Sequence, residues 1–380
     1  MMETRILPYW LLIFTIGFGW FSLAPLVPVL EYTFNVPLSS ILFIISAYGY
    51  SMAILGLLAG FLSAKFTTRS VLLLSSLLSF IGLLGRAVSN GFGTFFLFAI
   101  IASLAYPLAV APVGSIAKSV FKGNANTVVG ISVGILFIGM ALGSFISPSI
   151  LSFIGLRGTL MLNAILALIA MILIIPSLRS YPAHYERSLK GSFNLGMVKN
   201  WYVGLAVASI SVTLGSIASI VLQIHGIITL LAVSMGGFLT GLSFLGSGLG
   251  AIILPSLLEN RLRLGLISVG LLTSLSAVIT VLSLSFTINF PLIAIGYFLF
   301  GFFGNAYWSM AMASTTLYVN DPAKAGFATS MYSVITNVGV SVIPETVGVL
   351  FSNNSTIIEG VIIVVIIELI AGLLSFFLKS

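Results

Sequence analysis

The sequence contains no cysteine, only two histidines and very little charge. Without cysteine it has no disulfide framework, no thiol nucleophile and no cysteine-ligated metal site. His184 and His225 lie far apart in the chain, which excludes the paired histidines of an HExxH zinc site. Charged residues make up 6% of the 380 residues, against about one-quarter in soluble globular domains, so a soluble enzyme is excluded by composition.

Long apolar stretches dominate instead: 59% of the residues are hydrophobic and the mean hydropathy is +1.22. A helix that crosses about 30 Å of hydrocarbon needs roughly 20 apolar residues and satisfies its own backbone hydrogen bonds. Polar cues such as Asn35-Val36-Pro37 and Ser89-Asn90-Gly91 divide the chain into twelve such segments, which predicts an all-α integral membrane protein. The segments are continuously apolar rather than alternating, which excludes a β-barrel. We expect them at 8–31, 38–63, 70–88, 92–117, 125–151, 157–176, 201–223, 229–254, 265–286, 290–317, 324–350 and 356–377.

The distribution of basic residues predicts how the chain is oriented in the membrane. With a cytoplasmic amino terminus, thirteen of the fifteen basic residues fall in inside loops and tails, and only Arg86 and Arg157 fall outside. Because inside loops carry the excess of Lys and Arg, both termini are expected in the cytoplasm. The net charge of +7 is therefore an orientation signal, and no nucleic-acid partner is expected.

The chain divides into two halves that resemble each other. The most polar interruption, residues 177–200, predicts a cytoplasmic linker between six-helix bundles at 1–176 and 201–380. Gly56-x-x-x-Gly60 recurs as Gly246-x-x-x-Gly250, and Gly143 with Pro148 recurs as Gly339 with Pro344. Repeated halves of this kind surround a midplane site in secondary transporters, and small residues permit close helix packing.

Twelve spans, two repeated halves and a basic loop after the second helix resemble the major facilitator superfamily across essentially the whole chain. The family signature in that loop is roughly G-x-L-A-D-R-x-G-R-R, and here the stretch runs from Gly60 to Arg69, with Gly60, Leu62, Lys65 and Arg69 matching. Ala64 replaces the acid that is thought to latch the inner gate. The resemblance implies that the second-half equivalent, Glu259 with Arg261 and Arg263, supplies that charge network.

Helix 5 is similar to the family's glycine-rich antiporter signature only in Gly139-x-x-x-Gly143, so antiport is not inferred. The resemblance also implies that helices 1, 4, 7 and 10 line a central cavity, that 2, 5, 8 and 11 stand beside them, and that 3, 6, 9 and 12 are outermost.

Polar and aromatic stripes on these helices give the candidate substrate-binding residues. Five polar side chains of helix 7 fall within an arc of about 120°, although hydroxyls also bond to their own helix. In helix 10, Asn305 needs hydrogen-bond partners in hydrocarbon, either from neighbouring helices or from a substrate. Aromatic residues of helices 1 and 4 would favour an apolar or aromatic solute, or simply pack. The cavity candidates are Phe18, Phe21, Tyr106, Ser209, Thr213, Ser216, Gln223, Tyr297, Asn305, Trp308 and Asn337.

Ionisable residues inside the membrane are costly and mark function. Glu345 shares a face of helix 11 with Asn337 and Ser341 and is the candidate for proton coupling; the alternative is a gate contact with Arg86 or a backbone group. Glu368, near the middle of helix 12, is expected to be neutral, paired or at an oligomer contact. Arg86, close to its helix end, is expected to extend toward the membrane surface.

The sequence therefore predicts a multi-pass protein of the cell membrane that moves a small neutral or amphipathic organic solute by alternating access, with possible proton coupling. Its expected partners are the lipid bilayer, the solute and protons, and we expect a monomer without metal or cofactor. A nutrient or anion permease and a passive channel or scramblase remain alternatives. The anion alternative lacks a basic residue at mid-membrane in the cavity helices. An intramembrane serine protease would need Ser247 and His225 together and is not expected.

Overall fold

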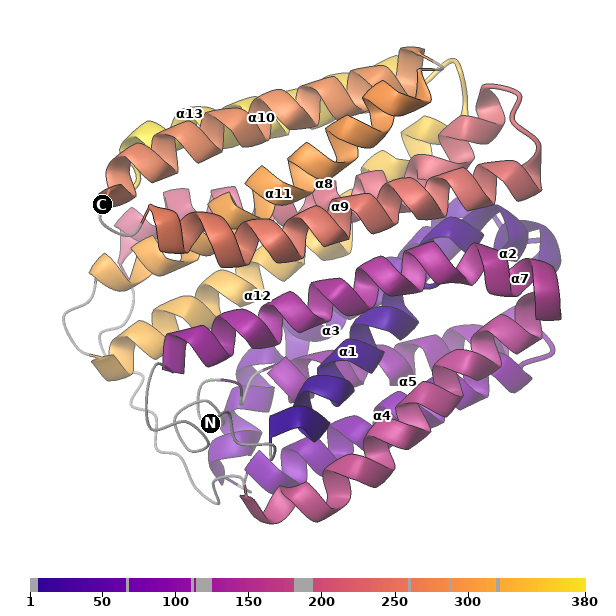
Figure 1. Cartoon of the computed structure of the whole chain (residues 1–380), viewed down its shortest axis with the longest axis horizontal. Coiled ribbons are helices and arrows are strands. Elements are labelled where there is room, and N and C mark those ends of the chain that lie inside the picture. Colours follow the sequence, from indigo (N-terminus) through magenta and orange to yellow (C-terminus); the bar gives the residue numbers. More distant parts are fainter. Residues whose placement is uncertain are drawn as a thin grey trace.

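The computed structural model describes residues 6–65, 68–110, 113, 125–180, 194–258, 261–287, 289–318 and 322–380, and within these ranges the ordered elements are helices (Figure 1). The α-helices are α1 (Leu7–Phe21), α2 (Val27–Phe34), α3 (Leu38–Lys65), α4 (Thr68–Val88), α5 (Phe92–Val110), α7 (Ala125–Ser177), α8 (Val198–Ile224), α9 (Thr229–Leu257), α10 (Leu262–Phe286), α11 (Phe290–Thr315), α12 (Pro322–Val347) and α13 (Ile357–Leu374). Short 3₁₀ turns are η2 (Ala24–Leu26), η3 (Leu178–Ser180), η4 (Leu195–Met197), η6 (Thr316–Tyr318), η7 (Gly348–Ser352) and η8 (Ser375–Phe377).

Eleven helices of the described ranges are long and apolar enough to cross a membrane, which confirms the all-α membrane fold. The helix α7 consists of two helices that meet at Gly155, whose φ of 69° lies in the left-handed region that glycine adopts without steric cost. Divided there, α7 supplies the two predicted segments 125–151 and 157–176, with a single residue in place of the expected loop. Most of the predicted linker, 181–193, lies outside the described residues.

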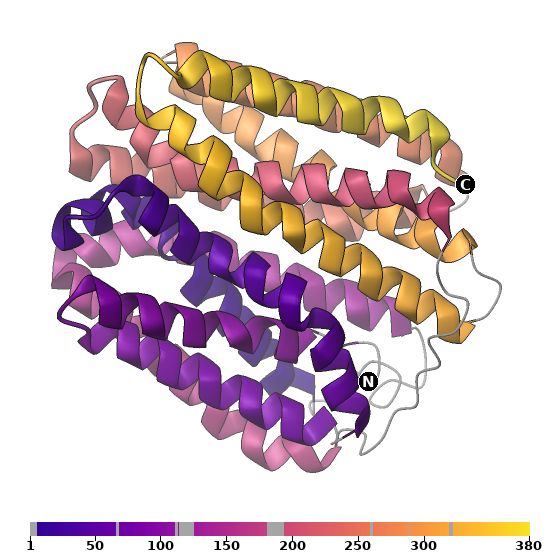
Figure 2. The ribbon, with the colours of Figure 1, turned by 180° about the vertical axis from the view of Figure 1, so that it is seen from behind.

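The two halves of the chain occupy different halves of the molecule. Figure 1 shows α1 to α7 below α8 to α13, and Figure 2 shows the same division from behind. Two helix pairs join the halves, α3 with α12 and α7 with α9. In addition, η2 and α2 contact α8 and α9, so the second part of the first membrane-spanning helix also packs across the boundary.

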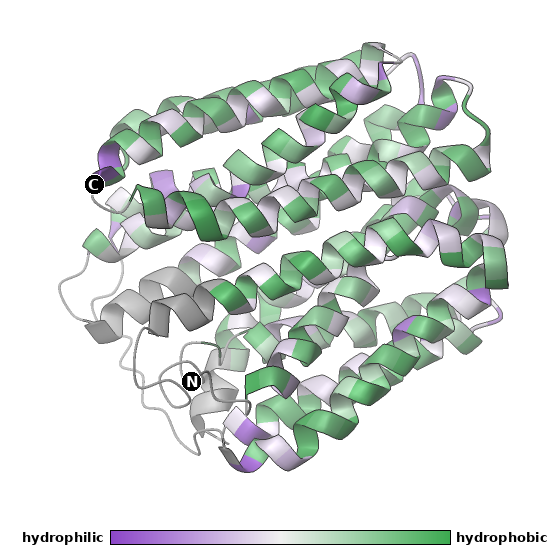
Figure 3. Ribbon diagram, viewed as in Figure 1, coloured by the Kyte–Doolittle hydropathy of each residue, from purple (hydrophilic) through white to green (hydrophobic). Residues whose placement is uncertain are grey.

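Outward-facing apolar side chains identify the lipid-facing helices. On α13, Ile362, Ile366 and Leu373 are exposed at helical spacing, while Val364 and Glu368 on the opposite face are buried. The helix α10 has the same arrangement, with Leu271 and Leu275 exposed. Figure 3 shows hydrophobic residues along the lengths of the helices and hydrophilic residues mainly near their ends. This pattern suits a bundle solvated by hydrocarbon.

Glycines permit close approach where helices cross. A Cβ atom at Gly143 would lie 2.5 Å from the carbonyl oxygen of Phe18, and one at Gly250 would overlap the carbonyl of Phe302. A Cβ atom at Gly49 would lie 2.8 Å from the backbone nitrogen of Ser341, at the contact between α3 and α12. The repeated glycines therefore act in helix packing.

The first membrane-spanning helix is interrupted between α1 and α2. Pro25 has no N–H to donate to the carbonyl of Phe21, and that carbonyl accepts a hydrogen bond from Ser144 Oγ of α7 at 3.2 Å. Leu23 N–H donates to the carbonyl of Trp20, so the carbonyl of Gly19 is also left free by the helix.

The freed carbonyl of Gly19 accepts hydrogen bonds from Ser22 Oγ at 3.2 Å and from Arg86 Nη1 of α4 at 3.1 Å. Asn163 of α7 in turn donates to Ser22 Oγ at 2.7 Å. Side chains of two neighbouring helices, α4 and α7, thus replace the hydrogen bonds that the break removes.

Candidate functional site

The polar face predicted on α12 lies against the other half of the molecule. Tyr50 of α3 donates a hydrogen bond to Glu345 Oε2 at 2.9 Å, and Glu345 is only partly buried. The expected alternative partners of Glu345, Arg86 or a backbone group, are not the ones found. Tyr50 was not among the predicted residues, although an aromatic hydroxyl in the middle of a membrane helix requires a partner.

A second side-chain contact joins the halves about two turns closer to the start of α12. The side chains of Asn337 and of Tyr106 on α5 interact with each other, and both are buried. Asn337 Nδ2 also donates to the carbonyl of Ser333 at 2.8 Å, and Ser341 Oγ donates to the carbonyl of Asn337 at 2.6 Å. We call Tyr50, Glu345, Tyr106 and Asn337 the interface cluster.

Aromatic rings extend this cluster into the first half. Trp20 stacks on Tyr48, with ring centroids 4.6 Å apart and an interplanar angle of 7°, and lies 5.3 Å from the ring of Tyr106. Its indole Nε1 donates to the carbonyl of Ile45 at 2.8 Å. Sequence reasoning singled out Tyr106 but missed Trp20 and Tyr48, because their contacts come from three different helices.

The predicted phenylalanines of helix 1 are buried, and Phe21 lies at the boundary between the halves. Phe21 is fully buried, 4.2 Å from the ring of Phe244 on α9, and Phe244 stacks on Phe137 of α7 at 6.1 Å. Phe18 is 4% exposed and packs beside Phe14. Phe21 also lies 5.3 Å from the ring of Trp20, so these rings adjoin the aromatic side chains beside the interface cluster.

The polar stripe of α8 is buried and bonds mainly to its own helix. Ser209, Thr213 and Ser216 donate to the carbonyls of Ala206, Ser209 and Val212, at 3.1, 2.7 and 2.8 Å. Gln223, at the end of α8, donates to Thr229 Oγ1 at 2.7 Å. These three hydroxyls are therefore satisfied without a substrate, whereas Ser219 Oγ, on the same face, has no hydrogen-bond partner among the described residues.

The candidates on α11 differ in their surroundings. Tyr297 is fully buried and donates to the carbonyl of Leu214 at 2.7 Å, an interhelical bond inside the second half. Asn305 donates to the carbonyl of Ser247 on α9 at 3.2 Å. Trp308 is partly buried, its indole Nε1 has no hydrogen-bond partner among the described residues, and its ring meets Tyr332 edge-on at 5.3 Å. Trp308 is thus the candidate on this helix with a free donor.

Arg86 does not extend toward the membrane surface, so that expectation is wrong. The side chain is 1% exposed and is enclosed by Gly19, Tyr48 and Phe95. Nη1 donates to Gly19, whereas Nε and Nη2 have no hydrogen-bond partner among the described residues. The break in α1 explains the change: it exposes a carbonyl inside the bundle that a buried donor can reach.

Comparison with known families identifies the family to which this helical fold belongs. The family model described as the Major Facilitator Superfamily matches residues 9–202, just over half of the chain. The chain belongs to the major facilitator superfamily. Among curated proteins, none matches the sequence.

Solved structures share the fold over nearly the whole length of the chain. A nucleoside transporter, NupG (D323A mutant), has a TM-score of 0.74 at 14% identity, covering 97% of this chain and 98% of its own. A D-xylose–proton symporter has a TM-score of 0.76 at 14% identity, covering 100% and 98%. A bacterial homolog of the human lysosomal transporter Spinster, inward-facing and unoccupied, has a TM-score of 0.71 at 13% identity, covering 99% and 96%.

The family's loop signature lies at the ends of α3 and α4. Gly60 and Lys65 belong to the last turns of α3, and Arg69 Nη2 donates to the carbonyl of Arg179 at 2.9 Å, within the first half. Arg261 and Arg263 are exposed at the start of α10. Glu259 lies outside the described residues, so the charge network proposed for the second half remains a prediction.

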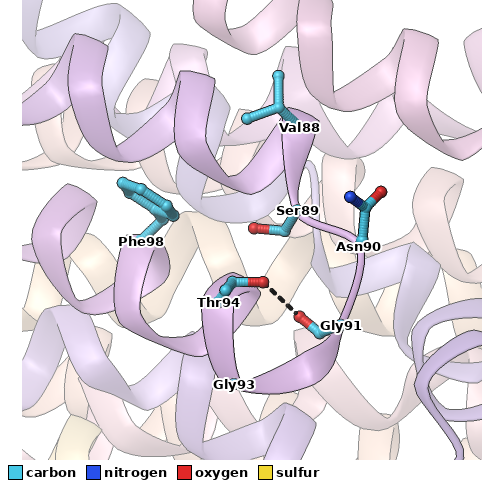
Figure 4. A pocket seen from close by; sticks show the side chains of 7 residues that line it. All are labelled: Val88, Ser89, Asn90, Gly91, Gly93, Thr94 and Phe98. Carbon is cyan, nitrogen blue, oxygen red and sulfur yellow. Dashed lines mark hydrogen bonds between the residues drawn. The ribbon is translucent and has the colours of Figure 1, made fainter.

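Two surface hollows lie away from the interface cluster. One, of about 470 Å³, is lined by Ser89, Thr94 and Phe98 at the turn between α4 and α5, where Thr94 donates to the carbonyl of Gly91 (Figure 4). The other, of about 410 Å³, is an apolar groove beside Leu7, Phe14 and Leu173. Neither contains a side chain from the list of cavity candidates, so we place the candidate site at the interface cluster.

Proposed function

We propose that this protein is a secondary transporter that moves a small neutral or amphipathic organic solute across the cell membrane by alternating access. The observation that carries the proposal is the interface cluster, in which Tyr50–Glu345 and Tyr106–Asn337 join the two halves of a major facilitator fold. Bonds of this kind must break if the halves rock apart around a solute. Two structural neighbours are named for neutral solutes, a nucleoside and D-xylose; we extend only the solute class to this chain.

The packing of η2 and α2 against α8 and α9 supports a state that is closed at the predicted outer end. In the same proposal, Phe18, Phe21 and Trp308 supply apolar surface next to the solute. Asn305, Asn337 and Tyr106 supply hydrogen bonds when the halves part. The remaining candidates have a structural role in this proposal, through hydrogen bonds within α8 or to neighbouring residues: Ser209, Thr213, Ser216, Gln223 and Tyr297.

We assign proton coupling to Glu345. An ionised carboxylate accepts a charge-assisted hydrogen bond, which is roughly twice as strong as one between neutral groups. Protonation of Glu345 therefore weakens its bond from Tyr50 and favours separation of α3 from α12. In this way proton uptake can bias the equilibrium between the two access states.

The test is transport by Glu345→Gln in reconstituted vesicles. Glutamine still accepts a hydrogen bond from Tyr50 but cannot titrate, so proton-driven accumulation is lost while solute counterflow continues. Glu359→Gln, at an exposed acid in the first turn of α13, is the matched control and behaves as the parent protein. Unchanged driven accumulation in Glu345→Gln rejects the coupling role.

A ligand-dependent thermal-shift screen on purified protein identifies the solute, because binding to the folded state raises its melting temperature. Saturable uptake with counterflow supports the transporter, whereas linear flux without saturation supports a channel or scramblase. The second candidate is an anion permease, and the observation that favours it is the buried guanidinium of Arg86. That candidate is supported if anionic solutes alone shift the melting temperature.

A further inference from the structure

Glu368 is a buried acid that the proposed mechanism leaves without a role. It lies on the inward face of α13, its side chain is fully buried, and neither carboxyl oxygen has a hydrogen-bond partner among the described residues. The outward face of the same helix consists of exposed isoleucine and leucine side chains. Glu368 therefore points into the second half of the molecule and is not available for an oligomer contact.

Three hydroxyl groups donate to the backbone of α13 near Glu368, one each from α8, α10 and α11. Tyr202 of α8 donates to the carbonyl of Ile367 at 3.3 Å, Ser274 of α10 to the backbone carbonyl of Glu368 at 2.5 Å, and Tyr307 of α11 to the carbonyl of Ala371 at 2.7 Å. Each of these hydroxyl groups donates to the backbone of α13, so the carboxyl oxygens have no donor in the part of the chain that the structure describes.

No cation of the described residues offsets a charge at this position. The titratable groups that face Glu368 are the phenols of Tyr202 and Tyr307; Ser274 of α10 and Ser375 of η8 are neutral. An ionised carboxylate without a partner in a water-free interior is strongly unfavourable, whereas the protonated acid costs far less. Packing alone would be served better by leucine or methionine, so an unsatisfied acid here indicates a function.

A proton is the ligand that fits this space. It needs no cavity, whereas a metal ion requires several oxygen ligands at coordinating distance, and the carboxyl oxygens have no exposed surface. The helices α8 and α13 are in contact, and we place the route of the proton along this contact. Tyr202 is partly exposed, and one turn before it the exposed Lys199 donates to the carbonyl of Phe377 at the end of η8.

We propose that Glu368 is a proton-binding site that is loaded in this conformation and is emptied through Tyr202 toward the end of α8 at Lys199. On release the carboxyl O–H bond breaks, the phenol oxygen of Tyr202 accepts that proton and passes its own to water, and the carboxylate keeps the negative charge. That Glu368 is protonated in this conformation follows from its burial without a hydrogen-bond donor or a cation among the described residues. Release during a transport cycle rests on the proposed function.

The first measurement is the infrared carboxylic-acid C=O band of the purified full-length protein. Between about pH 5 and 9 exposed carboxyl groups are already ionised, so a band that persists at neutral pH reports a buried protonated acid. We expect it in the parent protein and in Glu345→Gln, and its loss in Glu368→Gln, which has the shape of the protonated acid. Absence of the band in the parent protein, or its persistence in Glu368→Gln, overturns the proposal.

The second measurement is thermal stability against pH. A folded state that binds one proton more than the unfolded chain becomes less stable as pH rises above about 4.3, by up to tenfold in the folding equilibrium constant per pH unit. The melting temperature of the parent protein falls over this range, and that of Glu368→Gln falls less. Equal pH profiles, or a sodium-dependent shift at fixed pH in the parent protein alone, reject the proton site.

Counterflow separates this proposal from the transport proposal. If the parent protein shows the infrared band but no counterflow, the proton site stands and the proposed function fails. If counterflow is present, Glu368→Gln is expected to retain it and to lose several-fold in proton-driven accumulation. Full driven accumulation in a variant that lacks the band rejects release during the cycle.

Discussion

At the scale of single residues, Arg86 carries a charge that is unfavourable to bury. Among the described residues, Nη1 of the guanidinium group has a hydrogen-bond acceptor and Nε and Nη2 have none, and the side chain is 1% exposed. Replacement of a buried charge by a hydrophobic group of similar volume is often neutral or stabilising by about 1–4 kcal/mol. In this protein the hydrogen bond from Arg86 to the carbonyl of Gly19 offsets part of the cost of burying the charge, since a hydrogen bond from a charged group contributes about 1.5–3 kcal/mol.

At this scale we predict that Arg86→Met leaves the melting temperature unchanged or higher and lowers solute uptake. The methionine fills the space without a charge, whereas the carbonyl of Gly19 keeps only its bond from Ser22. Thermal denaturation in detergent and vesicle uptake measure the two effects, with Arg157→Met at an exposed site as the control. A fall in stability typical of a core truncation, about 2–5 kcal/mol, contradicts this view of the charge.

Among the elements, the first membrane-spanning helix has the most unusual construction. Ser22 and Leu23 keep right-handed helical angles through the break, so the chain remains close to a helix although two carbonyls are released from it. Those carbonyls bond to α4 and α7 instead. The segment after the break is the one that contacts α8 and α9, so it can move relative to α1 only if these side-chain bonds rearrange.

A double-mutant cycle tests this construction. Ser144→Ala leaves the buried carbonyl of Phe21 without a donor and is expected to destabilise the protein by about 1–3 kcal/mol. Pro25→Ala restores an N–H at the position that can bond to this carbonyl, so the double variant recovers most of the loss. Melting temperatures of the four proteins provide the readout. Strictly additive effects would show that Ser144 does not replace the missing helix bond.

For the whole molecule, contact across the boundary runs along two helix pairs, α3 with α12 and α7 with α9. Gly348, the first residue of η7 directly after α12, lies against Leu42 of α3, near the predicted outer end. Because the natural chain has no cysteine, a pair of introduced cysteines reports on this contact alone.

Leu42→Cys with Gly348→Cys is expected to form a disulfide that abolishes transport when oxidised, because the halves can no longer part at that end. Reduction restores uptake, and each single variant transports under both conditions. Vesicle uptake before and after reduction is the measurement. Full uptake by the cross-linked protein would exclude separation of α3 from α12 at this position.

The fold could be predicted from the sequence because each helix that crosses the hydrocarbon layer must by itself be long enough and apolar enough to do so. Sequence reasoning placed Asn337 and Glu345 on one polar face for the same reason, since spacing within one helix is fixed by geometry. It could not name Tyr50 as the partner of Glu345, because 295 residues separate them and pairing depends on how two halves dock. The buried position of Arg86 was missed because it follows from a break in another helix.

The stacked pair of Trp20 and Tyr48 has a practical consequence. The chain has four tryptophans, and Trp20 touches Tyr106, whose hydroxyl is held by the opposite half. In the proposed mechanism, solute binding separates Tyr106 from Asn337, which changes the surroundings of this indole. Its intrinsic emission can therefore follow the opening of the protein in real time, without any attached dye.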